Sequence, residues 1–429
     1  MLKNLILPLT FLFALTFLRV SSPFKENTKG LEKSSIHVPA RVITNGPKHH
    51  WFGYYDKRQF DPSDRFVLCM EVDFEGRSPK PEDEITIGMI DLENDDKWIK
   101  LGTSKAWSWQ QGCMLQFIPG SDSLVIWNDR SDGQFISHVL NIYTRKEKIH
   151  PFAIYTLSPD GIHAVTTNFE RIQDTRPGYG YAGIPDPNRA EIAPENAGIY
   201  VCNLKTGEKK QIISYAQMAN MLMLADDNAN KDRAEQKNWF NHLLFNTNGS
   251  RFIFLHRWKA VNKKDVGGFA TLMYTSDLEG KDIHLVDPSN YTSHFIWRDA
   301  NHIAAWTRQP SDGPGFYIFT DGKPEETYVL NQEKMPVNGH NTYLPNNQNW
   351  ILNDSYPDKD RMQHVYLFNI KTDERIALGD FYLPQEYRGE WRCDTHPRAS
   401  NNGKMVCIDC PTENGGRQLV LMDISKIIR

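Results

Sequence analysis

The sequence predicts an all-β protein, a seven-bladed β-propeller, and two observations carry the prediction. First, a strand, a tight polar turn and a second strand recur along the chain at a spacing of roughly 40 to 60 residues, the period of blade repeats. Second, the turns consist of Asn, Asp, Gly, Ser and Pro, the residues of tight hairpins. The seven copies span residues 55–68, 112–127, 154–166, 242–255, 294–306, 340–352 and 396–408.

Residues 1–22 have the layout of a secretory signal peptide. Lys3 precedes an apolar run from Leu5 to Leu18, and small polar residues follow the run. The run is shorter than the roughly 20 residues that a membrane-spanning helix needs. We therefore expect an exported, periplasmic or extracellular protein whose mature chain has no membrane span. A retained N-terminal anchor is the alternative.

Residues 36–429 form one propeller domain in this interpretation. Most copies are followed by a third strand and a short fourth strand, which completes a four-stranded blade. The seventh copy has its third strand at 418–424 and lacks a fourth. The segment from Ile36 to Ile43 has the composition of a strand and no other assignment. We expect it to complete the last blade, which would close the ring and cover both sheet edges.

The interval between the third and fourth copies is much longer than the others. It contains a loop rich in Gly, Pro and Tyr at 171–196 and a helical pattern at 215–236. Long loops in compact domains are usually functional lids or disordered inserts. The Tyr and Arg content favours a lid, so we expect a loop and helix insert, at about 171–237, over the top face of the ring.

The composition limits the partners. A net charge of −4 lacks the basic excess of a nucleic-acid-binding protein, so we expect no nucleic-acid partner. The six cysteines are scattered over the predicted strands and loops, and a domain of this size needs no disulfide scaffold. The aromatic content of 12% suits stacked sheets and also a sugar-binding surface. We expect a monomer.

The topology of a blade indicates where chemistry takes place. The first strand of each blade lies closest to the axis, and the second strand returns to the face where the first began. We call this face the mouth of the ring. The first strands begin at Tyr54, Gln111, Tyr155, His242, His294, His340 and His396.

Three of these histidines, His242, His340 and His396, occupy the same position relative to the turn in three blades, and His294 is one residue out of register. Imidazoles that converge near the axis, with a carboxylate beside them, are ligands for zinc or manganese. We therefore predict metal ligation by His340, Asp394 and His396. The alternative is that these side chains line a water-filled channel.

The second strand of the fourth blade ends in His256 and Arg257, which we expect to face His242 across the hairpin. A histidine pair beside an arginine can remove a proton next to a carboxylate that the arginine neutralises. An ordinary ion pair is the alternative. Further side chains of the mouth and the lid are predicted to bind the substrate, arginines by holding its anionic groups and tyrosines of the lid by stacking on its sugar rings. They are Arg171, Arg176, Tyr179, Tyr181, Tyr356 and Arg392.

The C-terminal repeat carries a resemblance to a known family. The run Asp394-Thr-His396-Pro397, the SNNGK turn and the GGRQLVLMDI strand resemble the pattern of oligogalacturonate lyases, and the repeats as a whole resemble TolB-like propellers. The resemblance implies that His396 and Asp394 fall on two metal-binding histidines of the lyases, with Asp in place of one of them. It implies that His340 matches the metal histidine of the preceding blade.

The resemblance also implies an activity, the β-elimination of an acidic oligosaccharide that contains uronic acid. A metal or an arginine neutralises the C6 carboxylate, a base removes the C5 proton, and the C4 oxygen leaves. The implied cofactor is a divalent metal, namely manganese, calcium or zinc. Two alternatives stay open, because fold does not decide function. One is a non-catalytic propeller that binds a glycan or a protein, and the other is a glycoside hydrolase with paired carboxylates such as Asp354 and Asp358.

Overall fold

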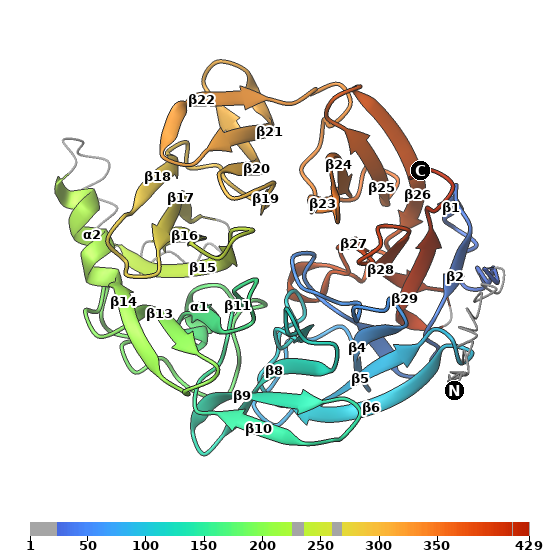
Figure 1. Ribbon diagram of the computed structural model, residues 1–429, viewed down its shortest axis with the longest axis horizontal. Coiled ribbons are helices and arrows are strands. Elements are labelled where there is room, and N and C mark those ends of the chain that lie inside the picture. Colours follow the sequence, from blue (N-terminus) through green and yellow to red (C-terminus); the bar gives the residue numbers. More distant parts are fainter. Residues whose placement is uncertain (1–23, 225–235, 260–267, 414, 429) are drawn as a thin grey trace, which may run out of the picture.

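Seven sheets surround a central axis in the computed structural model, which describes residues 24–224, 236–259, 268–413 and 415–428 (Figure 1). Neighbouring strands are antiparallel, and each sheet takes its strands from one stretch of sequence, apart from two N-terminal strands. The predicted seven-bladed β-propeller is confirmed. The predicted signal peptide lies outside the described residues. Among the described residues no helix is both long and apolar enough to cross a membrane.

The first three blades follow one another in chain order. Blade one contains β3 (His49–Trp51), β4 (Phe66–Val72), β5 (Ile85–Asp91) and β6 (Lys97–Ser104). Blade two contains β7 (Gln116–Phe117), β8 (Leu124–Ser131), β9 (Gln134–Asn141) and β10 (Glu147–His150). Blade three contains β11 (Thr156–Leu157), β12 (His163–Thr166), β13 (Gly198–Asn203) and β14 (Lys209–Ser214).

The remaining blades complete the ring. Blade four contains β15 (Lys237–Phe245), β16 (Arg251–Lys259), β17 (Ala270–Asp277) and β18 (His284–Asp287). Blade five contains β19 (Phe295–Trp297), β20 (His302–Gln309), β21 (Gly313–Thr320) and β22 (Lys323–Val329). Blade six contains β23 (Thr342–Leu344), β24 (Asn347–Asn353), β25 (Met362–Asn369) and β26 (Glu374–Tyr382). Blade seven contains β27 (Arg398–Ala399), β28 (Met405–Thr412) and β29 (Gly416–Asp423).

The polar turns form hairpins for reasons that the sequence shows. In the first repeat the carboxylate of Asp61 accepts hydrogen bonds from the backbone N–H of Ser63, at 3.1 Å, and of Phe66, at 2.6 Å. This side chain therefore replaces backbone partners within the turn. In the third repeat Gly161 has a φ of 67°, a left-handed conformation that glycine adopts without strain.

The N-terminal segment serves two blades. β2 (Ala40–Val42) pairs with β29 and supplies the outer strand of blade seven, where the sequence placed a closing strand. β1 (Ser35–Ile36) pairs with β26 and adds a fifth strand to blade six. The predicted closing strand at 36–43 is therefore shorter than expected, because its first residue belongs to the neighbouring sheet.

The long insert divides into two parts. The loop predicted to start at 171 begins instead with the helix α1 (Phe169–Thr175), and the chain after it approaches the mouth. The helix α2 (Tyr215–Leu224) follows β14 and lies at the outer rim of the ring, so this part does not cover the mouth (Figure 1). The rest of the predicted helical stretch, at 225–235, lies outside the described residues.

A buried ion pair joins the last blade to the first. The Arg398 guanidinium donates to the Asp409 carboxylate at 2.8 Å, and each side chain is only 2% exposed. Asp409 also accepts the backbone N–H groups of Phe52 and Gly53, at 3.2 and 3.1 Å. Arg398 reaches Gln59 as well, at 2.9 Å. These bonds close the ring at its axis, while β2 closes it at its outer edge.

Asp409→Asn should destabilise the protein by about 3 to 5 kcal/mol, because it leaves the Arg398 charge buried without a carboxylate. Chemical denaturation followed by tryptophan fluorescence measures the loss. The control is Glu326→Gln, which removes one partner of the exposed Lys323–Glu326 pair and should change stability by less than about 0.5 kcal/mol. Equal stability of the Asp409→Asn variant and the native protein would contradict the role of this pair.

A candidate active site at the mouth of the ring

Three imidazoles from three successive blades meet near the axis. His294, His340 and His396 each lie one or two residues before the first strand of blades five, six and seven. The ring centroids of His294 and His340 are 4.1 Å apart, and those of His340 and His396 are 4.2 Å apart. The first strands converge at the axis, which brings residues distant in sequence into contact. His294, which is out of register in the repeat, is thus part of the cluster.

His242 lies apart from these three, on the other side of Tyr54. The Tyr54 ring stacks on His242 with centroids 5.2 Å apart, and it lies 5.3 Å from the His396 ring. Both His242 and His396 have a positive φ, 53° and 41°. Such left-handed conformations are uncommon for residues other than glycine, and they concentrate at functional sites.

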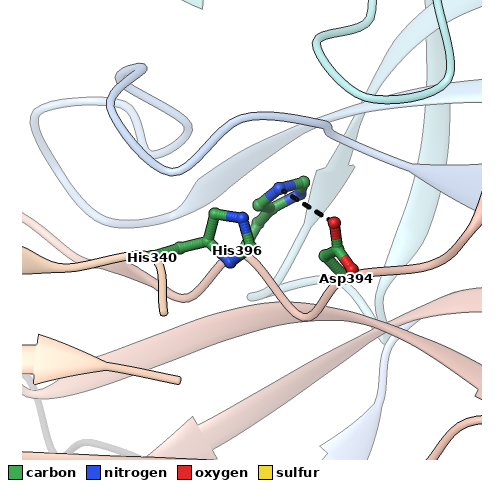
Figure 2. Close-up of side chains that lie close together, drawn as sticks. All are labelled: His340, Asp394 and His396. Carbon is green, nitrogen blue, oxygen red and sulfur yellow. Dashed lines mark ion pairs between the residues drawn. The ribbon is translucent and has the colours of Figure 1, made fainter. Parts of the chain in front are cut away.

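His340, Asp394 and His396 bring ligand atoms within 4.8 Å of one another (Figure 2). All three side chains are buried, and the Nε2 atoms of both histidines and Oδ1 of Asp394 have no hydrogen-bond partner. Buried polar atoms normally find partners. Two imidazole nitrogens and a carboxylate oxygen form a donor set that suits zinc or manganese. The residues predicted as metal ligands are therefore close enough, and free enough, to hold a cation.

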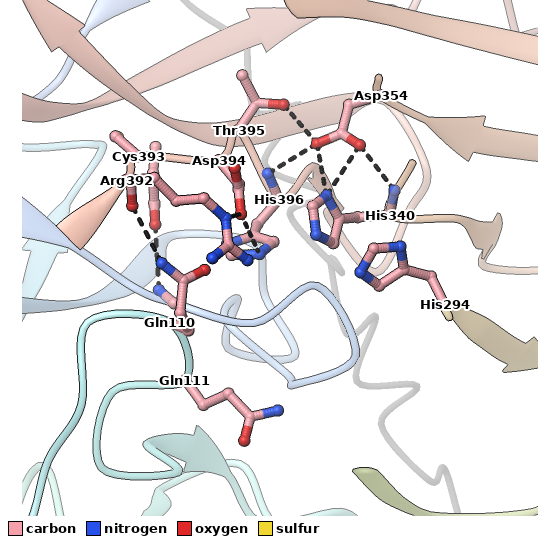
Figure 3. A network of polar contacts seen from close by, with 12 residues as sticks. Gln110, Gln111, His294, His340, Asp354, Arg392, Cys393, Asp394, Thr395 and His396 are labelled. Carbon is pink, nitrogen blue, oxygen red and sulfur yellow. Dashed lines mark hydrogen bonds and ion pairs between the residues drawn. The ribbon is translucent and has the colours of Figure 1, made fainter. Parts of the chain in front are cut away.

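The carboxylate of Asp354 positions this donor set (Figure 3). It accepts the backbone N–H and Nδ1 of His340, at 2.7 and 2.9 Å, and the backbone N–H of His396, at 3.1 Å. Burial alone would lower the pKa of His340, but Asp354 raises it above the ordinary value. A proton on Nδ1 that is bonded to a carboxylate leaves Nε2 with a lone pair, the usual arrangement of a metal-binding histidine.

Arginines gather on the other side of the mouth. Arg392 donates to Asp394 at 2.6 Å and to the Tyr179 hydroxyl at 2.9 Å. Arg257 is buried, donates to Thr271 at 3.2 Å, and has an Nη1 without a partner. Burial and the nearby Arg176 lower the pKa of Arg257 to about 9. Adjacent guanidiniums of this kind favour an anionic ligand.

Within the described residues neither Arg176 nor Arg257 forms an ion pair with an acidic side chain. Arg176 lies 4.7 Å from the centroid of the Tyr179 ring and 4.6 Å from that of Phe269, and its buried Nε has no hydrogen-bond partner. The structure thus leaves two cationic side chains without a carboxylate at the mouth. Of the other predicted binding residues, Tyr356 joins the cluster, 5.7 Å from His340 and 5.8 Å from His294 between ring centroids.

His256 does not face His242 as the sequence analysis expected. The ladder between β15 and β16 shifts its register between Asn241 and Leu244, so His256 lies opposite Phe240. Its Nε2 bonds the Asn238 side chain at 2.6 Å, and burial lowers its pKa to about 3. The ladder therefore does not place His256 opposite His242, which has no ladder partner on β16, and His256 is a core residue.

Two further predicted binding residues are used inside the fold. Arg171 is fully buried in α1, where it pairs with Asp186 at 3.0 Å and donates to four backbone carbonyls. It thereby fixes the loop that carries Tyr179. Tyr181 is fully buried, and its hydroxyl accepts a hydrogen bond from Asn128 at 3.0 Å. Neither side chain is available to a ligand at the mouth.

The sequence analysis considered Asp354 only as one of the paired carboxylates of a glycoside hydrolase. It noted Tyr54 and Gln111 only as first-strand starts. The position of these residues in the repeat was the available signal, and the contacts that give them a role come from different blades. Cross-blade contacts of this kind cannot be read from one repeat.

No protein-family model matches the chain, and no curated protein sequence matches it. Solved structures do. An oligogalacturonate lyase from Vibrio parahaemolyticus aligns with a TM-score of 0.61 and 13% identity over 91% of this chain and 95% of that one. An oligogalacturonate lyase in complex with manganese aligns with a TM-score of 0.61 and 14% identity over 91% and 94% of the two chains. TolB from Acinetobacter baumannii aligns with a TM-score of 0.39 and 12% identity over 85% of this chain and 83% of that one. The resemblance to the two oligogalacturonate lyases thus extends to the fold.

We expect the purified protein to bind one divalent cation at the mouth. His396→Ala and Asp394→Ala should abolish binding, and Asp354→Asn, which frees His340, should weaken it by about 10- to 100-fold. Calorimetric titration of chelator-treated protein with manganese and with zinc measures the affinity. His163→Ala, in the hairpin of blade three, is the control. Identical binding by all four variants and the native protein would contradict this site.

Proposed function

We propose that the protein is a polysaccharide lyase that cleaves uronic-acid-containing oligosaccharides by β-elimination. The observation that carries the proposal is the pair of guanidiniums without an acidic partner, Arg176 and Arg257, beside the neutral imidazole of His242. The likeness to oligogalacturonate lyases supports the fold of such an enzyme. The apolar run at 5–18 supports export of the enzyme to the compartment where such glycans occur.

The arginines would recognise the acidic group of the substrate. A carboxylate can accept two parallel hydrogen bonds from a guanidinium, and Arg257 has an unpartnered Nη1 to offer. Neutralising the C6 carboxylate makes the neighbouring C5 proton more acidic, because the negative charge that develops on removal of the proton is delocalised onto that group. An electrostatic contribution of this kind is commonly the largest in catalysis.

The imidazoles of His242 and His294 are neutral at neutral pH. Burial and the Arg257 charge lower the pKa of His242 well below the ordinary value, and burial together with His340 does the same for His294. Neutral histidines can exchange protons with a substrate. His242, whose pKa Arg257 and Arg176 lower, and Arg257 itself are the two sequence-predicted catalytic residues that this proposal retains.

His340, Asp394 and His396 would hold a divalent cation, manganese, calcium or zinc. When bound, the cation would supply positive charge to an acidic group of the substrate. Arg392 shares Asp394 with this site through its Nε at 2.6 Å. Its guanidinium therefore links the cation site to Tyr179 and to the arginines on the other side of the mouth.

The protein should release unsaturated uronate products, detected by their ultraviolet absorbance, from at least one member of a panel of uronate oligosaccharides. Arg257→Met should lower kcat/KM by about 10²- to 10³-fold, because an electrostatic contact to the carboxylate is lost. Arg308→Met removes the corresponding but exposed arginine of blade five and serves as the control. If no uronate gives an unsaturated product, with or without added metal, the proposed lyase activity is contradicted. The alternative, a propeller that binds glycans without cleaving them, would then be favoured.

A further inference from the structure

Tyr179 lies at the centre of the charged groups of the mouth. Its hydroxyl oxygen accepts a hydrogen bond from Nη2 of Arg392 at 2.9 Å, and Arg176 lies 4.7 Å from its ring centroid. The ring stands edge-on to His242, with centroids 5.5 Å apart. A phenol oxygen that accepts a bond from one guanidinium, with a second guanidinium over its ring, is placed to carry negative charge.

A closed chain of hydrogen bonds determines which nitrogen of His242 carries the proton. The backbone N–H of His242 donates to the Tyr155 hydroxyl at 2.8 Å, and that hydroxyl donates to Oε1 of Gln111 at 2.8 Å. The other atom of the Gln111 amide, Nε2, therefore donates to Nδ1 of His242, at 3.2 Å.

This chain makes His242 a donor toward the substrate. A neutral imidazole has one N–H and one acceptor nitrogen. Because Nδ1 accepts the Gln111 bond, the proton of the neutral ring is on Nε2. The lone pair that a base would need is thus occupied by Gln111, and Nε2 can offer only a hydrogen bond.

We propose that Tyr179, and not His242, is the catalytic residue that takes the C5 proton, while His242 donates a hydrogen bond to the substrate through Nε2. The inference rests on the proposed lyase reaction for its substrate. The role of Tyr179 rests on its hydrogen bond from Arg392 and its contact with Arg176. The role of His242 rests on the chain of hydrogen bonds through Tyr155 and Gln111.

The surroundings of Tyr179 support its ionisation. The groups that face it are Arg392, Arg176, Arg257, Asp394, Tyr54, Tyr356 and His242. Burial raises the pKa of Tyr179, but Arg392 and Arg176 outweigh it and lower the pKa to about 8. In contrast, burial raises the pKa of Tyr54, Tyr55, Tyr155 and Tyr356.

The reaction balances without a further reagent. The phenolate oxygen of Tyr179 takes the C5 proton, the electron pair of the C5–H bond forms the C4=C5 double bond, and the C4–O bond breaks. The departing oxygen then takes the same proton from the Tyr179 hydroxyl. The enzyme returns to its starting state.

The return of the proton has a stereochemical consequence. One oxygen can serve C5 and the leaving group only if the C5 proton and the C4 oxygen lie on the same face of the sugar. Glucuronate and mannuronate have this arrangement, whereas in galacturonate and guluronate the two groups lie on opposite faces. The proposed substrate class is therefore glucuronate- or mannuronate-containing chains.

The first test does not depend on activity. Ultraviolet titration of tyrosinate should show one tyrosine of the native protein ionising near pH 8, compared with about 10 for ordinary tyrosines. Tyr179→Phe should remove this transition, Arg392→Met should move it to higher pH, and Tyr181→Phe, in the same loop, should leave it unchanged. A native protein in which no tyrosine ionises below about pH 9.5 would overturn the proposal.

The second test compares variants on glucuronan and polymannuronate. Tyr179→Phe should lower kcat/KM by about 10²- to 10⁴-fold, the usual contribution of a general base. His242→Gln, which keeps an N–H near the place of Nε2, should lose less than about tenfold, and His242→Ala more. For the native enzyme kcat/KM should rise with pH through about 8, because the phenolate is the active form. If His242→Gln is as inactive as His242→Ala while Tyr179→Phe is active, His242 is the base.

The substrate panel separates the two proposals. Turnover confined to polygalacturonate or polyguluronate would overturn the return of the proton by Tyr179 but support a lyase. A native protein that acts on no uronate would overturn the lyase and the catalytic role together, and the titration would still decide whether Tyr179 is ionised. Turnover of glucuronan or polymannuronate that is lost in Tyr179→Phe supports both proposals.

Discussion

The buried carboxylate of Asp354 joins blades six and seven at the axis, and the geometry of the mouth depends on it. A buried charge is costly unless hydrogen bonds compensate it. Asp354 is fully buried and is compensated by donors on both blades, His340 on one side and Thr395, at 2.6 Å, with His396 on the other. The hydrogen bonds that compensate this buried charge also fix the distance between the imidazoles of His340 and His396. The same contacts therefore stabilise the fold and set the geometry of the candidate metal ligands.

The opposite side of the mouth shows the reverse arrangement, in which charge is left uncompensated. Arg257 is buried next to Arg176, and each has a buried N–H without a partner. Like charges in such a place destabilise the folded protein. Natural proteins retain such costs at sites where activity needs them. An anionic ligand would supply the missing partner for both arginines, which connects the proposed substrate to a specific defect of the unliganded fold.

Repeat and turn chemistry were sufficient to predict the fold, because each blade contains its own strand and hairpin signals. That His340 and His396 come together was predictable too, since the first strands of neighbouring blades converge at the axis, and Asp394 lies two residues before His396. The pair of His242 and His256 was not, because His256 lies opposite Phe240, and the irregularity between Asn241 and Leu244, which leaves His242 without a ladder partner, has no sequence signal. Arg171 was misassigned for a related reason: arginine serves a binding surface and a buried loop anchor equally well, and only its contacts distinguish the two.

Repeat position places a histidine at the mouth, but its partner decides what the histidine can do. His340 donates a hydrogen bond from its Nδ1–H to the Asp354 carboxylate, so its Nε2 holds a lone pair and can bind a cation. Nδ1 of His242 accepts a hydrogen bond from the Gln111 amide, so its Nε2 holds the proton and can only donate. Two residues at one position of the same repeat thus have opposite tautomers. The difference arises from the acceptor oxygen of Asp354 in one blade and the donor nitrogen of Gln111 from another.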